Sequence, residues 1–548
     1  MTKIISFVNM KRRFAIFALV AFVSCSPQVG CVYDVIVAGG SASGVCAGIQ
    51  AARSGARTLI LEEGPWLGGM LTSAGVSAID GNYNLRAGLF GEFCDSVALR
   101  YGGYDALKTG WVSNILFQPH VGAEVLDNMA ARESLLTVKR HIRTEGVEKL
   151  DKGWKVLTDD GIYVCKVLVD CTELGDVAKM CGAKYDIGNA DGIIQDMTYV
   201  VTVRDYGQDA DRTIPEPDDY DRSLYADCCL NPGNVLPFEK GQTLWSQEMM
   251  LSYGRLPGGD IMLNWPIEGN DFYANIIDAD PNERAEAIRK AKNKALGYLY
   301  FIQTELGYRN LGIAEGEYPT DDGLPLIPYY RESRRIEGEV RFTFEAASAP
   351  YDCPEPVYRT GVAVGDYPVD HHHYAHPEWA KLHKSYSPIP SFTVPAGTMI
   401  PIGVEDLIVA EKSICTDAVV GGTTRLQPVV MELGQAAGIM AAMAARQGCR
   451  VRDLSVRQIQ SALLDAGARI QPYLDLEPSD PDFKALQRTG SMGLFQAEGS
   501  FAAWRGQMWM LSGRPERLDS VRTVDSPSAF STQLIDWKGN PGRLRKSP

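Results

Sequence analysis

The chain of 548 residues has little of what marks several common protein classes. It lacks an excess of positive charge: 54 lysines and arginines stand against 68 aspartates and glutamates, and the formal net charge is −14. Nucleic acid attracts basic surfaces, so this balance argues against a nucleic-acid partner. Low-complexity tracts and internal repeats are also lacking, and 45% apolar and 22% charged residues are ordinary for a globular protein. We expect two or more domains, each with its own core.

Paired cysteines are lacking as well. The twelve cysteines include no C-x-x-C pair, and only Cys228 and Cys229 are adjacent. Cys46, Cys171 and Cys415 lie inside apolar segments and have the character of small core residues. We therefore expect mostly free thiols and not a disulfide framework, even in an exported protein.

The apolar run near the N-terminus, residues 14–23, is shorter than the ~20 residues that a bilayer-spanning helix needs. Lys11, Arg12 and Arg13 precede it, and a basic head before a short apolar core is the form of an export signal. The run is followed by Cys25 in a context that resembles a bacterial lipobox, where a cysteine is lipidated and the chain is cut.

Several interpretations of residues 1–32 stay open. We favour an export signal and lipoprotein-type linker with a lipid anchor at Cys25. The alternatives are a plain cleaved signal, an uncleaved anchor, and a start codon at Met10 in place of Met1. The pair Arg12-Arg13 also suggests twin-arginine export, which carries folded proteins. In the favoured case the protein lies in the periplasm, or is attached to the outer membrane, of a Gram-negative-type bacterium.

A glycine-rich turn follows the first apolar segment after the signal. Residues 33–38 have the β-branched character of a buried parallel strand, and residues 45–55 read as a helix that ends at Gly55. A second strand at residues 57–61 is followed by two acids, Glu62 and Glu63. A strand, a glycine turn, a helix, a strand and an acid within about 30 residues form the context of dinucleotide binding.

Each part of this turn has a physical task. The helix N-terminus favours the negative charge of a pyrophosphate, and Glu62 is placed to accept hydrogen bonds from the adenosine ribose. The pattern is G-x-S-x-x-G, since Ser41 replaces the middle glycine. A tight turn without a ligand is the alternative. The candidate contacts are Gly39, Gly40, Ser41, Ala42, Ser43, Gly44, Glu62 and Glu63.

Spacing alone leaves NAD and FAD open, but three further segments resemble the FAD-dependent oxidoreductases. Residues 64–75 resemble the Leu-Gly-Gly-Met-x-Thr loop of that family, and the resemblance implies that Gly68, Gly69 and Met70 run along the pyrophosphate toward the flavin. This loop offers no histidine for a covalent tether, so we expect FAD to bind non-covalently.

The second such segment begins after a strand at residues 164–169. It resembles the Asp-x-Thr-x-x-Gly-Asp segment of the same family, with Thr172 and Asp176 at the matching positions. The resemblance implies that Asp176 bonds a ribityl or ribose hydroxyl. Residues 134–161 alternate like strands and fit the antiparallel hairpins that cover the adenine.

The third segment runs from residue 400 to 438 and resembles the family's closing segment. The family has Gly-Arg after its strand, where this chain has Glu411-Lys412, and that departure puts the local loop contact in doubt. The resemblance places the start of the next helix at the flavin, where the helix N-terminus and the charge of Arg425 would stabilise the reduced pyrimidine edge. The candidate contacts are Arg425, Gln427 and Pro428; an arginine that faces water is the alternative.

Residues 329–340 resemble the family's Tyr-x-Arg-Glu-x-Arg-Arg signature, in which Arg331 and Arg334 could bind polar substrate groups or fix the inserted domain against the flavin. A solvated, salt-bridged face is the alternative interpretation. In a later histidine-rich segment, Asp370 and His372 match a Tyr-Pro-x-Asp-x-His pattern of the family. A neutral His372 imidazole would take the proton of a substrate hydroxyl. A structural His–Asp pair, a surface loop and an incidental metal site compete with that role, and we do not predict a metal site.

The expected fold is α/β: a glutathione-reductase-like FAD-binding Rossmann domain interrupted by an α+β substrate domain. The expected boundaries are 33–195 and 396–450 for the FAD-binding domain and 196–395 for the substrate domain. Residues 451–548 are expected to form an appendage with a surface-layer-homology-like unit and a polar tail.

Two functions follow from this interpretation. The first is a FAD-dependent oxidoreductase that oxidises an alcohol or a sugar-type substrate by hydride transfer to flavin N5, with an unknown electron acceptor. The second is an exported lipoprotein that binds a glycan or processes a polysaccharide and carries FAD only as a structural or vestigial group.

Overall fold

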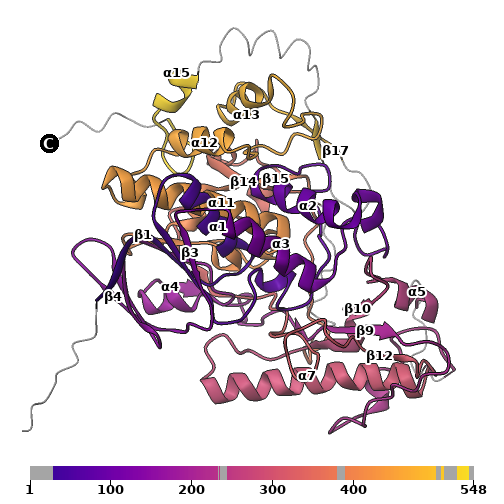
Figure 1. The fold of residues 1–548 in the computed structure, drawn as a ribbon. Coiled ribbons are helices and arrows are strands. Elements are labelled where there is room, and N and C mark those ends of the chain that lie inside the picture. Colours follow the sequence, from indigo (N-terminus) through magenta and orange to yellow (C-terminus); the bar gives the residue numbers. More distant parts are fainter. Residues whose placement is uncertain are drawn as a thin grey trace, which may run out of the picture.

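The computed structural model describes residues 29–232, 234, 244–378, 389–500, 508–510 and 527–541 (Figure 1). The expected export signal, the candidate anchor at Cys25 and both ends of the predicted polar tail lie outside these described residues.

A parallel sheet forms the centre of the molecule. Strands β3 (Leu136–Lys139), β2 (Thr58–Leu61), β1 (Val29–Ala38) and β6 (Gly161–Asp170) are neighbours in that order, and β16 (Leu407–Val409) pairs with the C-terminal half of β6. All of these pairings are parallel. The first of these strands in the chain and the last are almost 380 residues apart in sequence and meet through one shared neighbour, β6.

The N-terminal half of β6 has a second, antiparallel neighbour. Strand β5 (Trp154–Thr158) pairs with β6, and β4 (Thr144–Lys149) pairs with β5. This meander confirms the predicted antiparallel hairpins for residues 144–161, whereas β3, at the start of the predicted region, belongs to the parallel sheet. Strand β6 is therefore shared by the parallel sheet and the meander, which fits the glutathione-reductase-like α/β arrangement predicted from the sequence.

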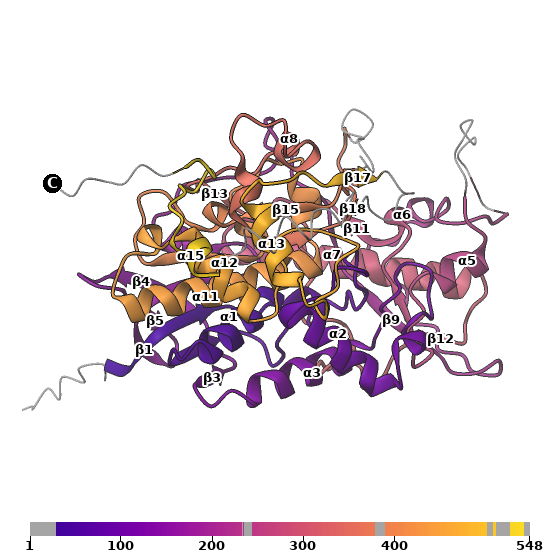
Figure 2. The same ribbon diagram turned by 90° about the horizontal axis from the view of Figure 1, so that it is seen from above.

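Two helices from opposite ends of the chain pack closely on one another. Helix α1 (Ala42–Arg53) follows β1, helix α11 (Gln427–Gln447) follows β16, and the two lie side by side in Figures 1 and 2. An added Cβ at Gly434 would lie 2.7 Å from Ser43 Cα and closer still to Ser43 O. Glycine on α11 thus allows direct contact between the two helix backbones.

Helices α2 (Gly88–Tyr101) and α3 (Pro119–Ala131) also pack near α1 and complete this side of the sheet. Figure 2 shows both helices on the same side of the molecule as α1.

The segment inserted between β6 and β16 has its own hydrophobic core. Strands β10 (Ile261–Leu263), β9 (Val201–Asp205) and β12 (Leu311–Ile313) form an antiparallel sheet in that order. The long helix α7 (Pro281–Thr304) begins with a capping box from Asp280 and packs in the same core. Figure 1 shows α7 and this sheet at the opposite end of the molecule from α12 and α13.

Residues 451–491, which were predicted to belong to an appendage, share the core of the central domain. Helix α12 (Val456–Asp465) packs against α11, and Leu486 of α13 (Phe483–Ser491) belongs to the same hydrophobic cluster. The buried Arg457 donates to Arg359 O at 3.0 Å and to Ser491 Oγ at 3.1 Å. The central core therefore continues past residue 451.

The remaining elements are short. They are α4 (Asp176–Met180), α5 (Gln247–Ser252), α6 (Ile267–Asn270), α8 (Phe344–Ser348), α10 (Gly421–Thr424), α15 (Pro527–Thr532), β7 (Tyr185–Asp186), β8 (Met197–Thr198), β11 (Asp271–Phe272), β13 (Arg335–Ile336), β14 (Gly361–Gly365), β15 (Phe392–Pro395), β17 (Glu498–Ser500) and β18 (Met508–Met510).

Two chemical properties of the described residues bear on the sequence predictions. Helix α11 is the one described helix long and apolar enough to cross a membrane, and its side chains are almost all buried inside the protein. The cysteines whose side chains are described are free thiols, as expected: Cys46, Cys94, Cys165, Cys171, Cys181, Cys228, Cys229, Cys353, Cys415 and Cys449.

Candidate functional site

The first glycine loop connects β1 to α1 in a tight turn. Gly39 has a φ of +90°, and an added Cβ there would lie 2.6 Å from Cys171 O, so only glycine fits. Ser41 caps α1 by accepting a hydrogen bond from Gly44 N at 3.3 Å. Ala42 begins the helix. The turn thus places the N-terminus of α1, which attracts anions, beside the C-terminal ends of β1 and β6.

Glu62 lies where the sequence predicted, at the end of β2 and against the loop. Its carboxylate accepts Gly40 N at 2.7 Å and Gly64 N at 2.6 Å. Burial raises the pKa of Glu62 to about 7, against the lowering effect of these two hydrogen bonds. The neighbouring Glu63 is exposed, although partial desolvation raises its pKa as well. Of the two acids, Glu62 is therefore the one held at the edge of the loop.

The second glycine loop lies directly beside the first. Gly68 N donates to Gly40 O at 2.7 Å, and Gly68 and Gly69 have φ values of +109° and +50°. Met70 is buried in the short turn that follows. An added Cβ at Gly69 would overlap Glu173 Oε1. The two loops predicted to flank a pyrophosphate are thus in contact.

Glu411 lies at the N-terminus of α1, a position that sequence reasoning did not predict. Its Oε2 accepts Ser41 Oγ at 3.0 Å and Ser43 N at 3.1 Å. Its Oε1 accepts Lys412 Nζ at 3.0 Å, and Lys412 also pairs with Glu173. Glu411 is fully buried and has a φ of +58°. Two donors expected to hold a pyrophosphate therefore hold a carboxylate of the chain itself.

Thr172 and Asp176 form a compact turn after β6. Thr172 Oγ1 donates to Asp170 Oδ1 at 2.7 Å and accepts Asp176 N at 2.9 Å. The Asp176 carboxylate accepts Arg334 Nη1 at 2.7 Å and Arg284 Nη1 at 3.2 Å. Asp176 thus contacts arginines of the inserted domain, and Thr172 orients the turn that carries it.

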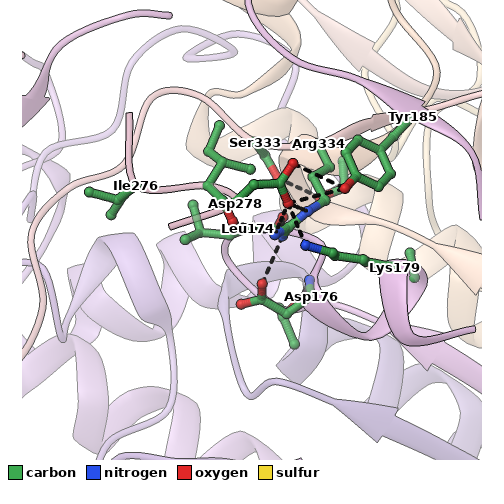
Figure 3. Close-up of polar contacts among 12 residues, drawn as sticks. Leu174, Asp176, Lys179, Tyr185, Ile276, Asp278, Ser333 and Arg334 are labelled. Carbon is green, nitrogen blue, oxygen red and sulfur yellow. Dashed lines mark hydrogen bonds and ion pairs between the residues drawn. The ribbon is translucent and has the colours of Figure 1, made fainter. Parts of the chain in front are cut away.

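Arg334 contacts a set of residues that does not include His372, and Figure 3 shows these contacts. Its side chain is 2% exposed and donates to Asp278 Oδ1 at 2.9 Å and to Leu174 O at 2.7 Å, in addition to Asp176. Figure 3 shows Lys179 and Tyr185 at the same Asp278 carboxylate. These partners join the two domains, which agrees with the second of the two predicted roles, fixing the inserted domain in place.

A buried group of charged residues, here called the acid–base cluster, lies where the inserted domain meets the start of α11. It comprises Asp80, Asp271, Arg331, Asp370, His372 and Arg425. His372 is at its centre: Nδ1 lies 2.6 Å from Asp271 Oδ2, and Nε2 lies 3.5 Å from Asp370 Oδ1.

Two arginines complete the cluster. Arg331 Nη1 donates to Thr198 Oγ1 at 2.6 Å and lies 3.3 Å from Asp271 Oδ1. Arg425 Nη2 lies 3.2 Å from Asp370 Oδ2, and its Nη1 donates to the hydroxyl of Tyr329. The structure thus brings together four residues that the sequence singled out separately: Arg331, Asp370, His372 and Arg425.

The charges of this cluster differ from the expected ones. Burial and Arg331 disfavour a protonated His372, but the carboxylates of Asp271 and Asp370 outweigh them and raise the pKa of His372. Burial opposes ionisation of Asp370, but His372 and Arg425 outweigh it and hold its pKa well below the usual range. His372 thus lies between two carboxylates that favour its protonated form, whereas the role considered from the sequence required a neutral imidazole.

Asp80 is a candidate residue that sequence reasoning missed. Its backbone N donates to Gln427 Oε1 at 3.4 Å, and Gln427 Nε2 donates to Ala78 O at 2.8 Å. Burial and the charge of Asp370 raise the pKa of Asp80 to about 7, although Arg425 lowers it. The signal in the sequence was an Asp-Gly pair soon after the second glycine loop.

The start of α11 agrees with the sequence prediction. Leu426 is the N-cap and Pro428 lies in the first turn, where a missing N–H costs little. Gln427 is buried and binds the segment that carries Asp80. The helix N-terminus therefore faces the acid–base cluster.

The metal alternative for the histidine segment finds no support in the described part of the chain. His371 Nε2 binds Val419 O at 2.9 Å, and His373 Nδ1 binds Ile194 O at 3.1 Å, so the two rings are engaged by backbone carbonyls. Among the described residues, no group of three His, Cys, Asp or Glu side chains is placed to hold a metal ion.

The residues present fit FAD in most respects. Gly39, Gly68 and Gly69 adopt positive φ and carry no side chain, Glu62 is held at the loop edge, and the N-termini of α1 and α11 belong to one packed pair of helices. At the α1 N-terminus, binding of a pyrophosphate requires that Glu411 release Ser41 and Ser43. When bound, FAD would supply a two-electron acceptor.

Comparisons with solved structures give only partial matches. An anhydrotetracycline hydroxylase, OxyS from Streptomyces rimosus, is 18% identical with a TM-score of 0.25, over 32% of this chain and 38% of its own. The amino acid oxidase NikD of nikkomycin biosynthesis is 13% identical with a TM-score of 0.22, over 33% of this chain and 60% of its own. A thioredoxin reductase from T. acidophilum is 18% identical with a TM-score of 0.16, over 25% and 34%. No curated protein matches the chain.

A family model gives broader coverage. The model described as FAD dependent oxidoreductase matches residues 34–463, a range that includes both glycine loops, the inserted domain, the acid–base cluster and α11. The fold is α/β with a Rossmann-type sheet, and the cofactor of the family is FAD. The chain therefore belongs to the FAD-dependent oxidoreductase family.

Proposed function

We propose that this oxidoreductase oxidises a hydroxyl group of a sugar-type substrate, with Asp80 as the base that accepts the hydroxyl proton. The observation that carries the proposal is the acid–base cluster, in which the pKa of Asp80 is raised to about 7 while Asp271 and Asp370 flank His372 and raise its pKa. Environments that push pKa values apart in this way are typical of acid–base catalysis.

Oxidation of an alcohol removes a hydride from carbon and a proton from oxygen. A carboxylate with a pKa near neutrality accepts that proton efficiently, because about half of it is ionised at neutral pH and the ionised form is still basic. Asp80 is held next to the start of α11 by Gln427, so its position is fixed by backbone contacts. The hydride acceptor is FAD, when it is bound.

The cations of the cluster suit the negative charge that develops on the substrate oxygen. The imidazolium of His372 and the buried guanidinium of Arg425 lie on either side of Asp370, and neither is exposed to bulk water. Fixed charges in a site of low dielectric stabilise such an oxyanion strongly. In this proposal the positive charge of His372 stabilises the ionised hydroxyl, and Asp80 acts as the base.

The sugar-type substrate rests on the polar character of the site. Carboxylates and arginines are the groups that recognise several neighbouring hydroxyls, and the cluster holds both kinds. Export to the periplasm or outer membrane, with a lipid anchor at Cys25, remains part of the proposal and would give the protein access to glycans; the electron acceptor is a partner still to be identified. Non-covalent FAD also remains part of the proposal.

The test is anaerobic reduction of the FAD-loaded protein by a panel of sugars, polyols and simple alcohols, followed by flavin absorbance. We expect one sugar-type compound to bleach the flavin, and Asp80→Asn to slow that reduction by about 10²-fold or more. Reduction of the wild type should decline below about pH 7 as Asp80 is protonated. Equal reduction rates for Asp80→Asn and wild type would show that another residue is the base. A wild-type rate that does not decline below about pH 7 would show the same.

A second function has one specific observation in its favour. Glu411 engages donors that a pyrophosphate would need, as expected if the protein were a glycan-binding lipoprotein with vestigial FAD. A protein that binds oligosaccharide but does not take up FAD at any concentration would support this second function.

A further inference from the structure

We infer that Glu411 competes with the pyrophosphate of FAD for the N-terminus of α1, so that the side chain of this one residue determines how tightly the cofactor binds. The inference rests on the FAD-dependent family and does not depend on the identity of the substrate.

The first support is the contact itself. Glu411 Oε2 accepts Ser41 Oγ at 3.0 Å and Ser43 N at 3.1 Å. Ser43 N belongs to the first turn of α1, where N–H groups have no partner within the helix. A phosphate oxygen at a helix N-terminus uses these same groups. One carboxylate thus satisfies the donors that a phosphate would need.

The second support is the charge around Glu411. Lys412, whose side chain is 1% exposed, lies between the carboxylates of Glu411 and Glu173. Two carboxylates thus share one cation before any ligand arrives, and burial together with the charge of Glu411 raises the pKa of Glu173. A pyrophosphate would add two more negative charges in a region from which water is excluded, which is unfavourable unless a carboxylate leaves.

The third support is an unpartnered atom on the same side. Glu173 Oε1 is buried and has no hydrogen-bond partner in the described part of the chain. It faces Gly69, because an added Cβ at Gly69 would overlap it. The two glycine loops, Glu173 and Glu411 therefore lie around the N-terminus of α1, and one polar atom of this group has no partner among the described residues.

The backbone at Glu411 points to the same conclusion. Its φ of +58° lies in the left-handed region, which glycine adopts without strain and other residues avoid. A glycine at this position would keep the loop conformation and leave Ser41 and Ser43 free for a ligand. Glutamate is therefore held there by the contacts of its side chain.

A consequence is that the protein without FAD has a satisfied α1 N-terminus. The carboxylate takes the place of the ligand as a helix cap, and Lys412 neutralises part of its charge. We therefore expect weak, readily reversible FAD binding by the wild-type protein.

The experiment compares the full-length wild type with Glu411→Gly and Glu411→Gln. Binding of FAD, ADP and adenosine is measured by isothermal titration calorimetry, together with the shift of the thermal midpoint on adding each ligand. Glu411→Gln preserves the side-chain volume and serves if the glycine variant does not fold. Glu405→Gln is the matched control. Glu405 lies just before β16, Glu411 lies just after it, and Glu405 pairs with Arg450 at the surface.

We expect Glu411→Gly to bind FAD and ADP about tenfold more tightly or better, because a buried like charge and a competing acceptor are both removed. Glu411→Gln should show a smaller gain. Adenosine, which has no phosphate, should bind equally to all four proteins.

Three results would overturn the inference: equal FAD and ADP affinities for wild type and both variants, an equal gain for adenosine, or the same gain in Glu405→Gln. Failure of all proteins to bind FAD and ADP would also refute it, because Glu411 would then not be what limits binding. Failure of the sugar oxidation alone would leave the inference standing and remove only the proposed substrate.

Discussion

Replacement of Gly434 by alanine tests the contact between α1 and α11, on which the cofactor site depends. The added methyl group would lie 2.7 Å from Ser43 Cα and from Ser43 C, and closer still to Ser43 O. Ordinary carbon–carbon contacts begin near 3.5 Å, so the helices would have to separate by roughly 1 Å.

The magnitude follows from what surrounds the clash. The atoms in conflict belong to backbone on both sides, and the helices are buried, so no flexible side chain relieves the overlap. Overpacking of a core costs about 1–3 kcal/mol, and a backbone clash of this kind lies at the upper end or above it. We therefore expect Gly434→Ala to lower the free energy of unfolding by ~3 kcal/mol.

Gly91→Ala provides a control of the opposite sign. Gly91 lies inside α2, and its added Cβ would be 3.5 Å from the nearest atom, Arg86 C, which is an ordinary contact. Alanine in a helix with free space stabilises by about 0.5–1 kcal/mol relative to glycine. Urea unfolding followed by circular dichroism compares both variants with wild type. If Gly434→Ala were as stable as Gly91→Ala, the close packing of α1 on α11 would be refuted.

Three further predictions concern single side chains. Glu62→Ala should weaken adenosine binding by about tenfold in calorimetry, because two backbone N–H groups and the ribose hydroxyls lose their acceptor. Glu63→Ala is the control, and because Glu63 is exposed this variant should bind adenosine as the wild type does. His372→Gln should slow flavin reduction by about tenfold or more in stopped flow without loss of bound FAD, because a fixed cation disappears; an unchanged rate would assign it a structural role. Burial raises the pKa of Glu432 from 4.5 to about 8, so the native state holds an extra proton between these values and stability should fall as pH rises across that window. Glu432→Gln should reduce the fall of the thermal midpoint between roughly pH 5 and pH 8. If the midpoint of the variant falls as steeply as that of the wild type, the proton is bound elsewhere.

The local parts of the site could be predicted from the sequence because their contacts are close along the chain. The turn at Gly39 and the acid Glu62 belong to one strand–helix–strand unit of about 30 residues, whose pattern follows directly from helix and strand geometry. Pro428 and Arg425 were likewise placed at a helix start by local signals. Each of these positions agrees with the structure.

The remaining contacts depend on which distant residues meet, and no local pattern contains that information. The partner of His372 is Asp271, 101 residues earlier, and this pairing favours a protonated imidazole where a neutral one was expected. Arg334 shares a signature with Arg331 but binds Asp278 instead of the cluster. Glu411 reaches Ser41 across 370 residues, so the sequence showed only an unusual loop residue.

The shared strand β6 has a consequence for synthesis of the chain. Its last partner, β16, begins at Leu407, and α11, which covers α1, ends at Gln447. A ribosome completes the inserted domain, with α7 and its sheet, well before either of these arrives. Until most of the polypeptide has been made, β6 therefore lacks its partner β16, and the surface of α1 that α11 covers stays exposed to solvent.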